Sequence, residues 1–291
     1  MTDVREFWLT NNLNQSYSLH RVETFMHDPA GLGFEVNLSA LRLGDSRLIV
    51  WDEYNLPNVQ GDLLFMEGRK PAYEQFFEFV EFLYHRPIQL HYRTPNTNKS
   101  YYCQVRVVEV NKTEVDHNDS ILHVPIQMYR QTLWYTDDIN TVVVVGGSDK
   151  GKQYELQRPY HYGGLSTSNI QLYNSGVNDT PMLIEIDGRC TDPLLSLYDN
   201  EKNLYGRSKI LGTYDYVAIN SDDLEEEITL IYNGGSIPNA VNFQDLSVGD
   251  PRKVFVTFLK MRPGQNTLVT NLPDGFDGRV IITWRNAYVA V

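Results

Sequence analysis

Three glutamates, Glu74, Glu78 and Glu81, are spaced so that they share one face of a helix, and grouped carboxylates are side chains that perform acid–base catalysis. The opposite face of the same segment is aromatic and apolar, which is typical of a helix that covers a core. Like charges at this spacing destabilise a helix by roughly 0.2–0.5 kcal/mol, which a solvated surface tolerates. We therefore interpret these glutamates as a solvated acidic face without a catalytic role.

Oxygen and imidazole ligands gather in a few places, but without the spacing of a known metal site. His117 lies between Asp116 and Asp119 in a polar stretch that we interpret as a hydrated loop. The segment that begins at Asp199 resembles a calcium-binding loop, yet it lacks the required glycine and the final glutamate, so a turn between two strands is favoured. An acidic run over residues 222–227 is typical of a solvated sheet edge. We predict no metal site and no cofactor.

Motifs for nucleophilic or phosphate chemistry are missing from the sequence. It contains no G-x-S-x-G, no HExxH and no phosphate-binding glycine loop. The two cysteines, Cys103 and Cys190, each lie in an apolar alternating run and are predicted to be reduced and partly buried. We therefore predict that the chain is not an enzyme. A cell-wall hydrolase, the enzymatic alternative, would need a carboxylate pair or a metal that we do not find.

Charge and composition exclude several further classes of protein. The 291-residue chain has 37 acidic and 25 basic residues, and its formal net charge of −12 repels nucleic acid phosphates and anionic membranes. Its 42% hydrophobic content fits a folded protein, and 19 Tyr, 12 Phe and 4 Trp favour β-sheet. The sequence shows neither a secretory signal nor an apolar run long enough to span a bilayer. We expect a soluble protein, made in a cytoplasm, without specific binding to nucleic acid or membrane.

Most of the chain alternates apolar and polar residues with period two, which predicts short strands. Residues 101–109 and 121–128 are two such segments, joined by a polar connection that fits a long hairpin. Residues 71–85 have helical spacing instead: the segment begins at Pro71, where the missing N–H costs nothing, and Pro87 follows its end. We expect this aromatic-faced helix to cover an open side of a sheet or barrel.

The sequence pattern changes between residues 135 and 150, where we place a domain boundary. We assign residues 1–140 to an N-terminal β domain that contains the helix. We assign residues 141–291 to a C-terminal β-sandwich, because strands recur there at near-regular spacing with Gly, Asn and Asp between them. The predicted fold class is mainly β.

Tyrosines on the predicted strands of the C-terminal domain raise the question of sugar binding. Four of them could stack on sugar rings if they are exposed: Tyr160, Tyr162, Tyr214 and Tyr216. Tyrosines at alternating strand positions also fill cores or form cross-strand pairs. The sequence leaves both interpretations open, so a carbohydrate-binding sandwich that contributes to cell-wall adhesion is the alternative function.

Several segments together resemble the distal tail proteins of siphophages, over essentially the whole chain. In the N-terminal half these segments are AYEQFFEFVEFL, PIQLHY, YYCQVRVVEV and VPIQMYRQTLWY. In the C-terminal half they are IEIDGRCTDPLLSLYD, RPGQNTL and VIITWRNAYVAV. A neighbouring tail-tip or tube protein would share the N-terminal architecture, but the galectin-like ending WRNAYVAV argues against that alternative.

This resemblance implies a fold and a mechanical role. The N-terminal domain would be split β-barrel-like with one helix, and would assemble as a hexameric ring around a channel through which DNA passes. The C-terminal domain would be a galectin-like β-sandwich outside the ring. The protein would be a structural virion component at the distal end of the tail, a baseplate hub that joins the tail tube protein to the tail-tip protein and anchors receptor-binding proteins for host attachment. We hypothesise that surplus negative charge lines the channel and repels passing DNA.

Overall fold

The computed structural model divides the chain into two units. Unit 1 comprises Met1–Asp137 and Tyr288–Val291, and unit 2 comprises Asp138–Ala287. Strands predominate in both units, so the predicted mainly β fold class is confirmed. Within the described part of the chain, no helix has the length and apolar character needed to cross a bilayer. The structure describes residues 5–43, 46–94, 99–115, 120–145, 161–162, 167–222, 224, 226–232, 235–236, 255–256, 258–273 and 276–291.

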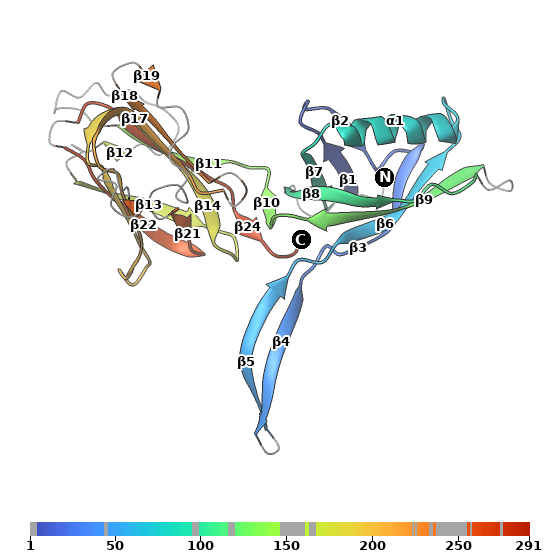
Figure 1. The fold of residues 1–291 in the computed structure, drawn as a ribbon, viewed down its shortest axis with the longest axis horizontal. Coiled ribbons are helices and arrows are strands. Elements are labelled where there is room, and N and C mark those ends of the chain that lie inside the picture. The colour runs from blue at the N-terminus through green and yellow to red at the C-terminus, as the bar shows by residue number, and fades with distance from the viewer. Residues whose placement is uncertain are drawn as a thin grey trace, which may run out of the picture. The chain divides into compact units, whose positions relative to one another are not determined.

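An open antiparallel sheet with the order β2-β1-β7-β8-β9-β6-β3 forms the body of unit 1 (Figure 1). Its strands β8 and β9 form the long hairpin that the sequence predicted. Other neighbours come from distant segments, since β1 pairs with β7 and β6 pairs with β9. The strands are β1 (Glu6–Thr10), β2 (Ser16–Ser18), β3 (Thr24–Ala30), β6 (Val59–Met66), β7 (Ile88–Arg93), β8 (Ser100–Val110) and β9 (Ile121–Arg130), with β10 (Trp134–Thr136) and β24 (Ala287–Tyr288) beside this path.

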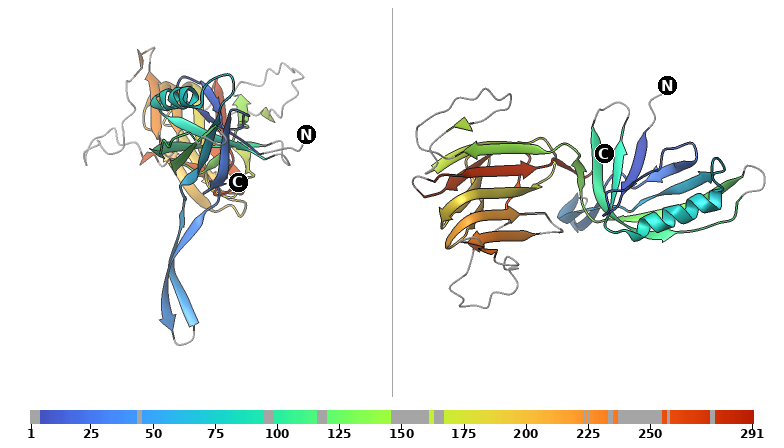
Figure 2. Two further views of the ribbon diagram at one scale, coloured as in Figure 1. Left: turned by 90° about the vertical axis from the view of Figure 1, so that its right-hand side faces the viewer. Right: turned by 90° about the horizontal axis from the view of Figure 1, so that it is seen from above.

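The helix α1 (Ala72–Tyr84) packs its aromatic face on this sheet (Figure 2). Phe79 is fully buried, with its ring centroid 5.8 Å from that of Phe65 and 5.0 Å from that of Tyr17. Pro71 has an extended ψ of 146° and is the N-cap residue, and His85 is the C-cap. The helix is therefore one residue shorter at each end than the predicted range 71–85. Its role as a cover over the sheet agrees with the sequence analysis.

Two long strands, β4 (Glu35–Leu43) and β5 (Ser46–Asn55), form a separate antiparallel sheet within unit 1, which we call the ribbon. Figure 1 shows the ribbon projecting away from the main sheet of the unit. Its pairing register shifts between Ser39 and Ala40, which is a β-bulge. The ribbon lies between β3 and β6 in the sequence, so its root is held where these two strands pair.

The last residues of the chain belong to unit 1, which corrects the assignment of the whole range 141–291 to the C-terminal domain. The physical reason is a set of contacts that these residues make with other residues of unit 1. The carbonyl of Val289 accepts a bond from the side chain of Arg130, and the N–H of Val291 donates to the carbonyl of Leu32 at 3.4 Å. The ring of Tyr288 also contacts that of Tyr101 edge-on.

Unit 2 consists of two sheets that supply opposite sides of one core, as in the predicted β-sandwich (Figure 1). The smaller sheet contributes β13, β22 and β15 to this core, and the larger contributes β14, β23 and β17. The larger sheet has the order β12-β11-β23-β14-β17-β18-β19, with β21 paired to β14, and the smaller has the order β13-β22-β15-β16-β20. The larger sheet contains β11 (Asn140–Val145), β12 (His161–Tyr162), β14 (Thr180–Thr191), β17 (Thr213–Asn220), β18 (Glu227–Tyr232), β19 (Gly235–Ser236), β21 (Lys260–Met261) and β23 (Arg279–Trp284). The smaller contains β13 (Thr167–Asn174), β15 (Leu194–Tyr198), β16 (Leu204–Lys209), β20 (Phe255–Val256) and β22 (Gly264–Asn271).

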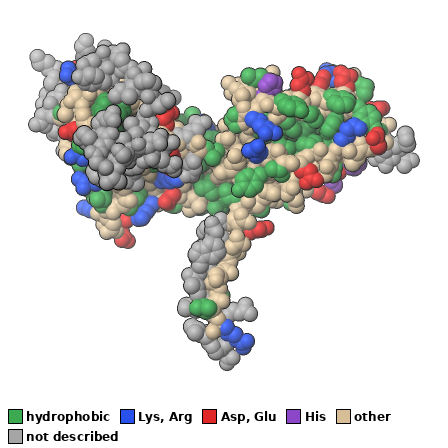
Figure 3. Space-filling model, in the orientation of Figure 1, with side chains coloured by type: hydrophobic (Ala, Val, Ile, Leu, Met, Phe, Trp, Pro, Cys, Tyr) green, Lys and Arg blue, Asp and Glu red, His purple; other side chains and the backbone are tan. Residues whose placement is uncertain are grey.

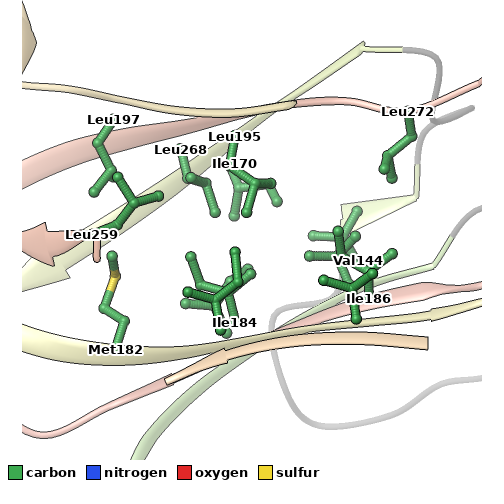
Figure 4. Packing of buried hydrophobic residues seen from close by; sticks show 14 of the residues in the cluster. Val144, Ile170, Met182, Ile184, Ile186, Leu195, Leu197, Leu259, Leu268 and Leu272 are labelled. Atoms are coloured by element: carbon green, nitrogen blue, oxygen red, sulfur yellow. The ribbon is translucent and has the colours of Figure 1, made fainter. Parts of the chain in front are cut away.

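The core of unit 2 follows from the period-two pattern of these strands. Figure 4 shows Ile184 and Ile186 of β14 on one side of the core and Leu195 and Leu268 of the smaller sheet on the other. Because alternate side chains of a strand point to opposite faces, these strands bury one set of side chains in the core, and most of the other set is partly or fully exposed; Ser196 of β15, at 7% exposure, is an exception. The exposed set on the smaller sheet is therefore available for contacts outside the unit.

Both cysteines are fully buried, and we expect neither to react in the folded protein. Burial raises the pKa of the Cys103 thiol, and burial together with the nearby Asp215 raises that of Cys190 to about 11. Since the thiolate is the reactive form, a disulfide exchange reagent at pH 8 should label no thiol in the native chain and both after denaturation in guanidinium. Rapid labelling of the native protein would show that one of the two segments opens.

Candidate interaction surfaces

The residues with catalytic or metal-binding potential do not converge in the structure. Among the residues that the structure describes, no group of three or more His, Cys, Asp or Glu side chains is arranged to hold a metal ion. The polar stretch around His117 lies outside the described residues. The carboxylate of Asp199 accepts the N–H groups of Glu201 and Asn203 at 3.0 and 2.8 Å and so closes the predicted turn between β15 and β16.

The glutamates of α1 lie at the surface. Glu74 and Glu78 are about half exposed, at 54% and 46%, and both form ion pairs with Lys70, which precedes the helix. Glu81 is also exposed. Ion pairs between exposed side chains contribute little to stability, so this face is a solvated surface with local charge compensation.

Of the four tyrosines proposed for sugar stacking, the structure describes the side chains of Tyr214 and Tyr216. Both of these hydroxyls are engaged in hydrogen bonds within unit 2. The hydroxyl of Tyr214 donates to the carbonyl of Leu211 at 2.9 Å, and its ring packs against the buried core of unit 2. The hydroxyl of Tyr216 donates to a carboxylate oxygen of Glu185 at 2.6 Å, and burial and this carboxylate raise the pKa of Tyr216. Tyr160 and the side chain of Tyr162 lie outside the described residues.

One face of the ribbon carries three exposed apolar side chains, and Leu41, which is 59% exposed, lies on the other face. Val36 and Leu38 are two residues apart on β4, and Ile49 of β5 lies opposite Ala40, the next residue of the same face. The exposed fractions of Val36, Leu38 and Ile49 are 40%, 59% and 57%. A hydrophobic side chain is visible near the end of the ribbon in Figure 3. Exposed apolar surface on a projecting two-stranded sheet is typical of a segment that a partner covers.

The root of the ribbon is fixed by a buried guanidinium. Arg130, at the end of β9, is 1% exposed. It donates to the carbonyl of Gly33 at 2.8 Å and lies 3.5 Å from that of Gly31, both just before β4, and donates to that of Val289 at 3.0 Å. Burial lowers the pKa of the Arg130 guanidinium, but this group stays charged in proteins. A single side chain therefore joins the ribbon root to the last residues of the chain.

The packing around Arg130 leaves little freedom. Its guanidinium lies over the ring of Trp134 at 5.4 Å, and Trp134 is itself fully buried. Gly31 has a φ of +83°, and a Cβ there would lie 1.9 Å from the carbonyl oxygen of Asn58, so a side chain is excluded. A hollow of about 690 Å³ lies beside this root, with Phe34 and Tyr129 in its wall.

A second hollow of unit 1, of about 580 Å³, lies between α1 and β8. Val80 and Leu83 of the helix and Val105 and Val107 of the strand give it an apolar lining, and Arg106 lies among the polar groups around it. The sequence analysis identified neither this groove nor the ribbon. The signal for the ribbon is present in EVNLSALRLGDSRLIVW, where two alternating runs flank the turn-forming pair Gly-Asp, a typical hairpin pattern.

Comparison with known proteins supplies a family for the first unit. The family model for the N-terminal domain of distal tail proteins matches residues 6–130, which include the sheet of unit 1, the ribbon and α1. A search of curated proteins gave no match.

Solved structures with a similar fold span nearly the whole chain. A chain of the phage P2 baseplate in its activated conformation with Ca is 17% identical, with a TM-score of 0.61 over 99% of this chain and all of that chain. The SPP1 Dit protein, described as a paradigm of the hub adsorption apparatus in phages that infect Gram-positive bacteria, is 14% identical, with a TM-score of 0.59 over 96% of this chain and 98% of that one. At these identities the likeness concerns the fold.

Proposed function

We propose that the chain is a phage distal tail protein, a virion component of the tail end, and that six copies of it assemble into a ring that acts as the baseplate hub. The ring would join the tail tube protein to the tail-tip protein and anchor receptor-binding proteins around its rim. DNA would pass through its channel without specific contacts, in keeping with the net charge of −12. The proposed role is mechanical, and we propose that the chain catalyses no reaction.

The apolar face of the ribbon is the observation that carries the proposal of self-assembly. Val36, Leu38 and Ile49 expose 40–59% of their surface on one face. In a projecting sheet of two strands, such side chains gain stability only when another surface removes them from water. A second copy of the chain is the proposed partner, because a ring repeats one contact between identical subunits and presents each ribbon to a neighbour.

The solution mass tests the ring directly. Light scattering of the purified chain should give about 200 kDa, six times the chain mass of 33.6 kDa, and negative-stain images of the same peak should show a central hole. A chain that stays at 33.6 kDa at every concentration up to the millimolar range would contradict self-assembly. Synthesis in a host cytoplasm remains an expectation.

Charge placed on the ribbon should disperse the ring without unfolding the subunit. Leu38→Asp puts a carboxylate on the apolar face at a side chain that is 59% exposed in the single chain. The main species should therefore shift from about 200 kDa to 33.6 kDa, with an unchanged denaturation midpoint of the subunit. Val22→Asp is the matched control, since Val22 is 88% exposed and lies outside the ribbon. A Leu38→Asp chain that keeps the mass of the parent would exclude the ribbon from the contact.

A further inference from the structure

The outer face of the smaller sheet in unit 2 carries a line of polar and aromatic side chains. On β13, Ile170 and Leu172 are buried in the sandwich, so Gln171 and Tyr173 point outward. Tyr173 is 63% exposed. This tyrosine lies outside the set of four that the sequence analysis named, and it is far more accessible than the partly buried Tyr214 and Tyr216.

Strand register places further outward side chains beside these two. Gln171 lies opposite Thr267 of β22, which lies opposite Tyr198 of β15, and Tyr173 lies opposite Gln265. The side-chain oxygen of Gln171 accepts bonds from the Gln265 amide at 3.1 Å and from the Thr267 hydroxyl at 3.3 Å. These bonds hold the amides and the hydroxyl in fixed orientations at the surface, beside an exposed aromatic ring.

The far side of the same face is basic. Arg207 and Lys209 of β16 lie opposite Ser196 and Leu194 of β15, are exposed, and point to the same side as Gln171 and Tyr198. Among the outward positions that the structure describes on β13, β22, β15 and β16, Arg207 and Lys209 are the charged residues, and both are positive. The whole chain, by contrast, has a net charge of −12. A basic site on an acidic protein favours an anionic partner.

We propose that this face, which we call the outer strip, binds an anionic polysaccharide. A sugar ring stacks on Tyr173, and the amides of Gln171 and Gln265 bond to its hydroxyls. Arg207 and Lys209 hold carboxylate or phosphate groups of later residues of the glycan, as a planar guanidinium and an ammonium do. Strands lie about 4.8 Å apart and residues along a strand about 3.4 Å apart, so Tyr173 and Arg207, which are three strands and four residues apart in register, are separated by roughly 20 Å. This distance suits several linked sugars.

Chemistry favours a glycan over a protein partner at this strip. A protein interface core is typically apolar and depleted in lysine, whereas this strip, beside Tyr173, Tyr198 and the 49% exposed Leu204, carries two amides, a hydroxyl and two cations. The proposal does not depend on ring assembly, because all these residues belong to one sheet of one chain. A ring would only multiply the number of strips and raise the avidity for a repeating polymer.

An array of neutral and anionic bacterial surface polysaccharides, probed with the labelled full-length chain, tests the outer strip. Signal is expected on anionic glycans and should fall with added salt. Tyr173→Ala and the double variant Arg207→Gln, Lys209→Gln should each lower the apparent affinity about tenfold, a loss of about 1.4 kcal/mol. Tyr216→Phe is the matched control, because it removes one hydroxyl from a tyrosine of the other sheet.

Three outcomes would overturn the proposal: no signal on any glycan, signal confined to neutral glycans, or equal binding by the parent and the strip variants. Light scattering on each variant separates these outcomes from a failure of assembly. The strip variants should keep the mass of the parent, whatever that mass is. Failure of the ring would therefore leave the glycan result interpretable, and failure of the strip would leave the ring proposal intact.

Discussion

Replacement of Phe79 by alanine should lower the free energy of unfolding by about 3–5 kcal/mol. The ring of Phe79 is fully buried between α1 and the sheet of unit 1, in contact with Phe65 and Tyr17. Its removal takes away apolar burial and leaves a cavity that the sheet on one side and the helix on the other cannot close. Denaturant titration followed by tryptophan fluorescence measures the change, since Trp134 lies in the same unit.

The same helix supplies the control. Phe77 is 62% exposed, and Phe77→Ala should change the free energy of unfolding by no more than about 0.5 kcal/mol. Both variants make the same substitution in one helix and so change helix propensity equally. If the two were equally destabilising, α1 would not be packed on the sheet through Phe79.

Replacement of Arg130 by methionine should destabilise the protein by about 3–5 kcal/mol. Methionine matches much of the aliphatic volume but leaves the carbonyls of Gly33 and Val289 without their charged donor. Each of these two charge-assisted bonds contributes about 1.5–3 kcal/mol, and the two losses add. Thermal and denaturant unfolding both measure the effect.

Arg106→Met provides the comparison for this variant. Arg106 lies on the neighbouring strand β8 and is exposed. The free energy of unfolding of this variant should therefore differ from that of the parent by no more than about 0.5 kcal/mol. Because Arg130 also fixes the root of the ribbon, its replacement should weaken self-assembly at temperatures where the subunit is still folded. An Arg130→Met chain as stable as the parent would show that other contacts satisfy these carbonyls.

Local patterns predicted the elements that depend on neighbours in sequence. The helical spacing of residues 71–85 predicted α1, although it did not identify Phe79 as a buried residue, and the alternation in residues 101–109 and 121–128 predicted the hairpin of β8 and β9. These predictions succeed because the geometry of a helix or a strand directly sets the spacing of the residues that share one face. The mainly β class follows from the same source.

Features that depend on tertiary context escaped the sequence analysis. Period two locates the two faces of a strand but does not say which face meets a partner, so Tyr214 and Tyr216 were named where Tyr173 is the exposed ring. The buried position of Arg130 was equally invisible, because its acceptors are main-chain carbonyls, which any residue supplies. The pairing of β1 with β7 requires knowledge of the whole sheet.

The return of Tyr288–Val291 to unit 1 has a consequence for the order in which the protein is made. A ribosome delivers Met1–Asp137 first, but the acceptor that Val289 offers to Arg130 emerges only after all of unit 2. Until then, the guanidinium lacks one of its carbonyls and the ribbon root lacks its bond to Val291. The nascent ribbon is thus less firmly anchored than the ribbon of the folded unit, and we expect its proposed pairing with other copies to follow the synthesis of Val289 and Val291.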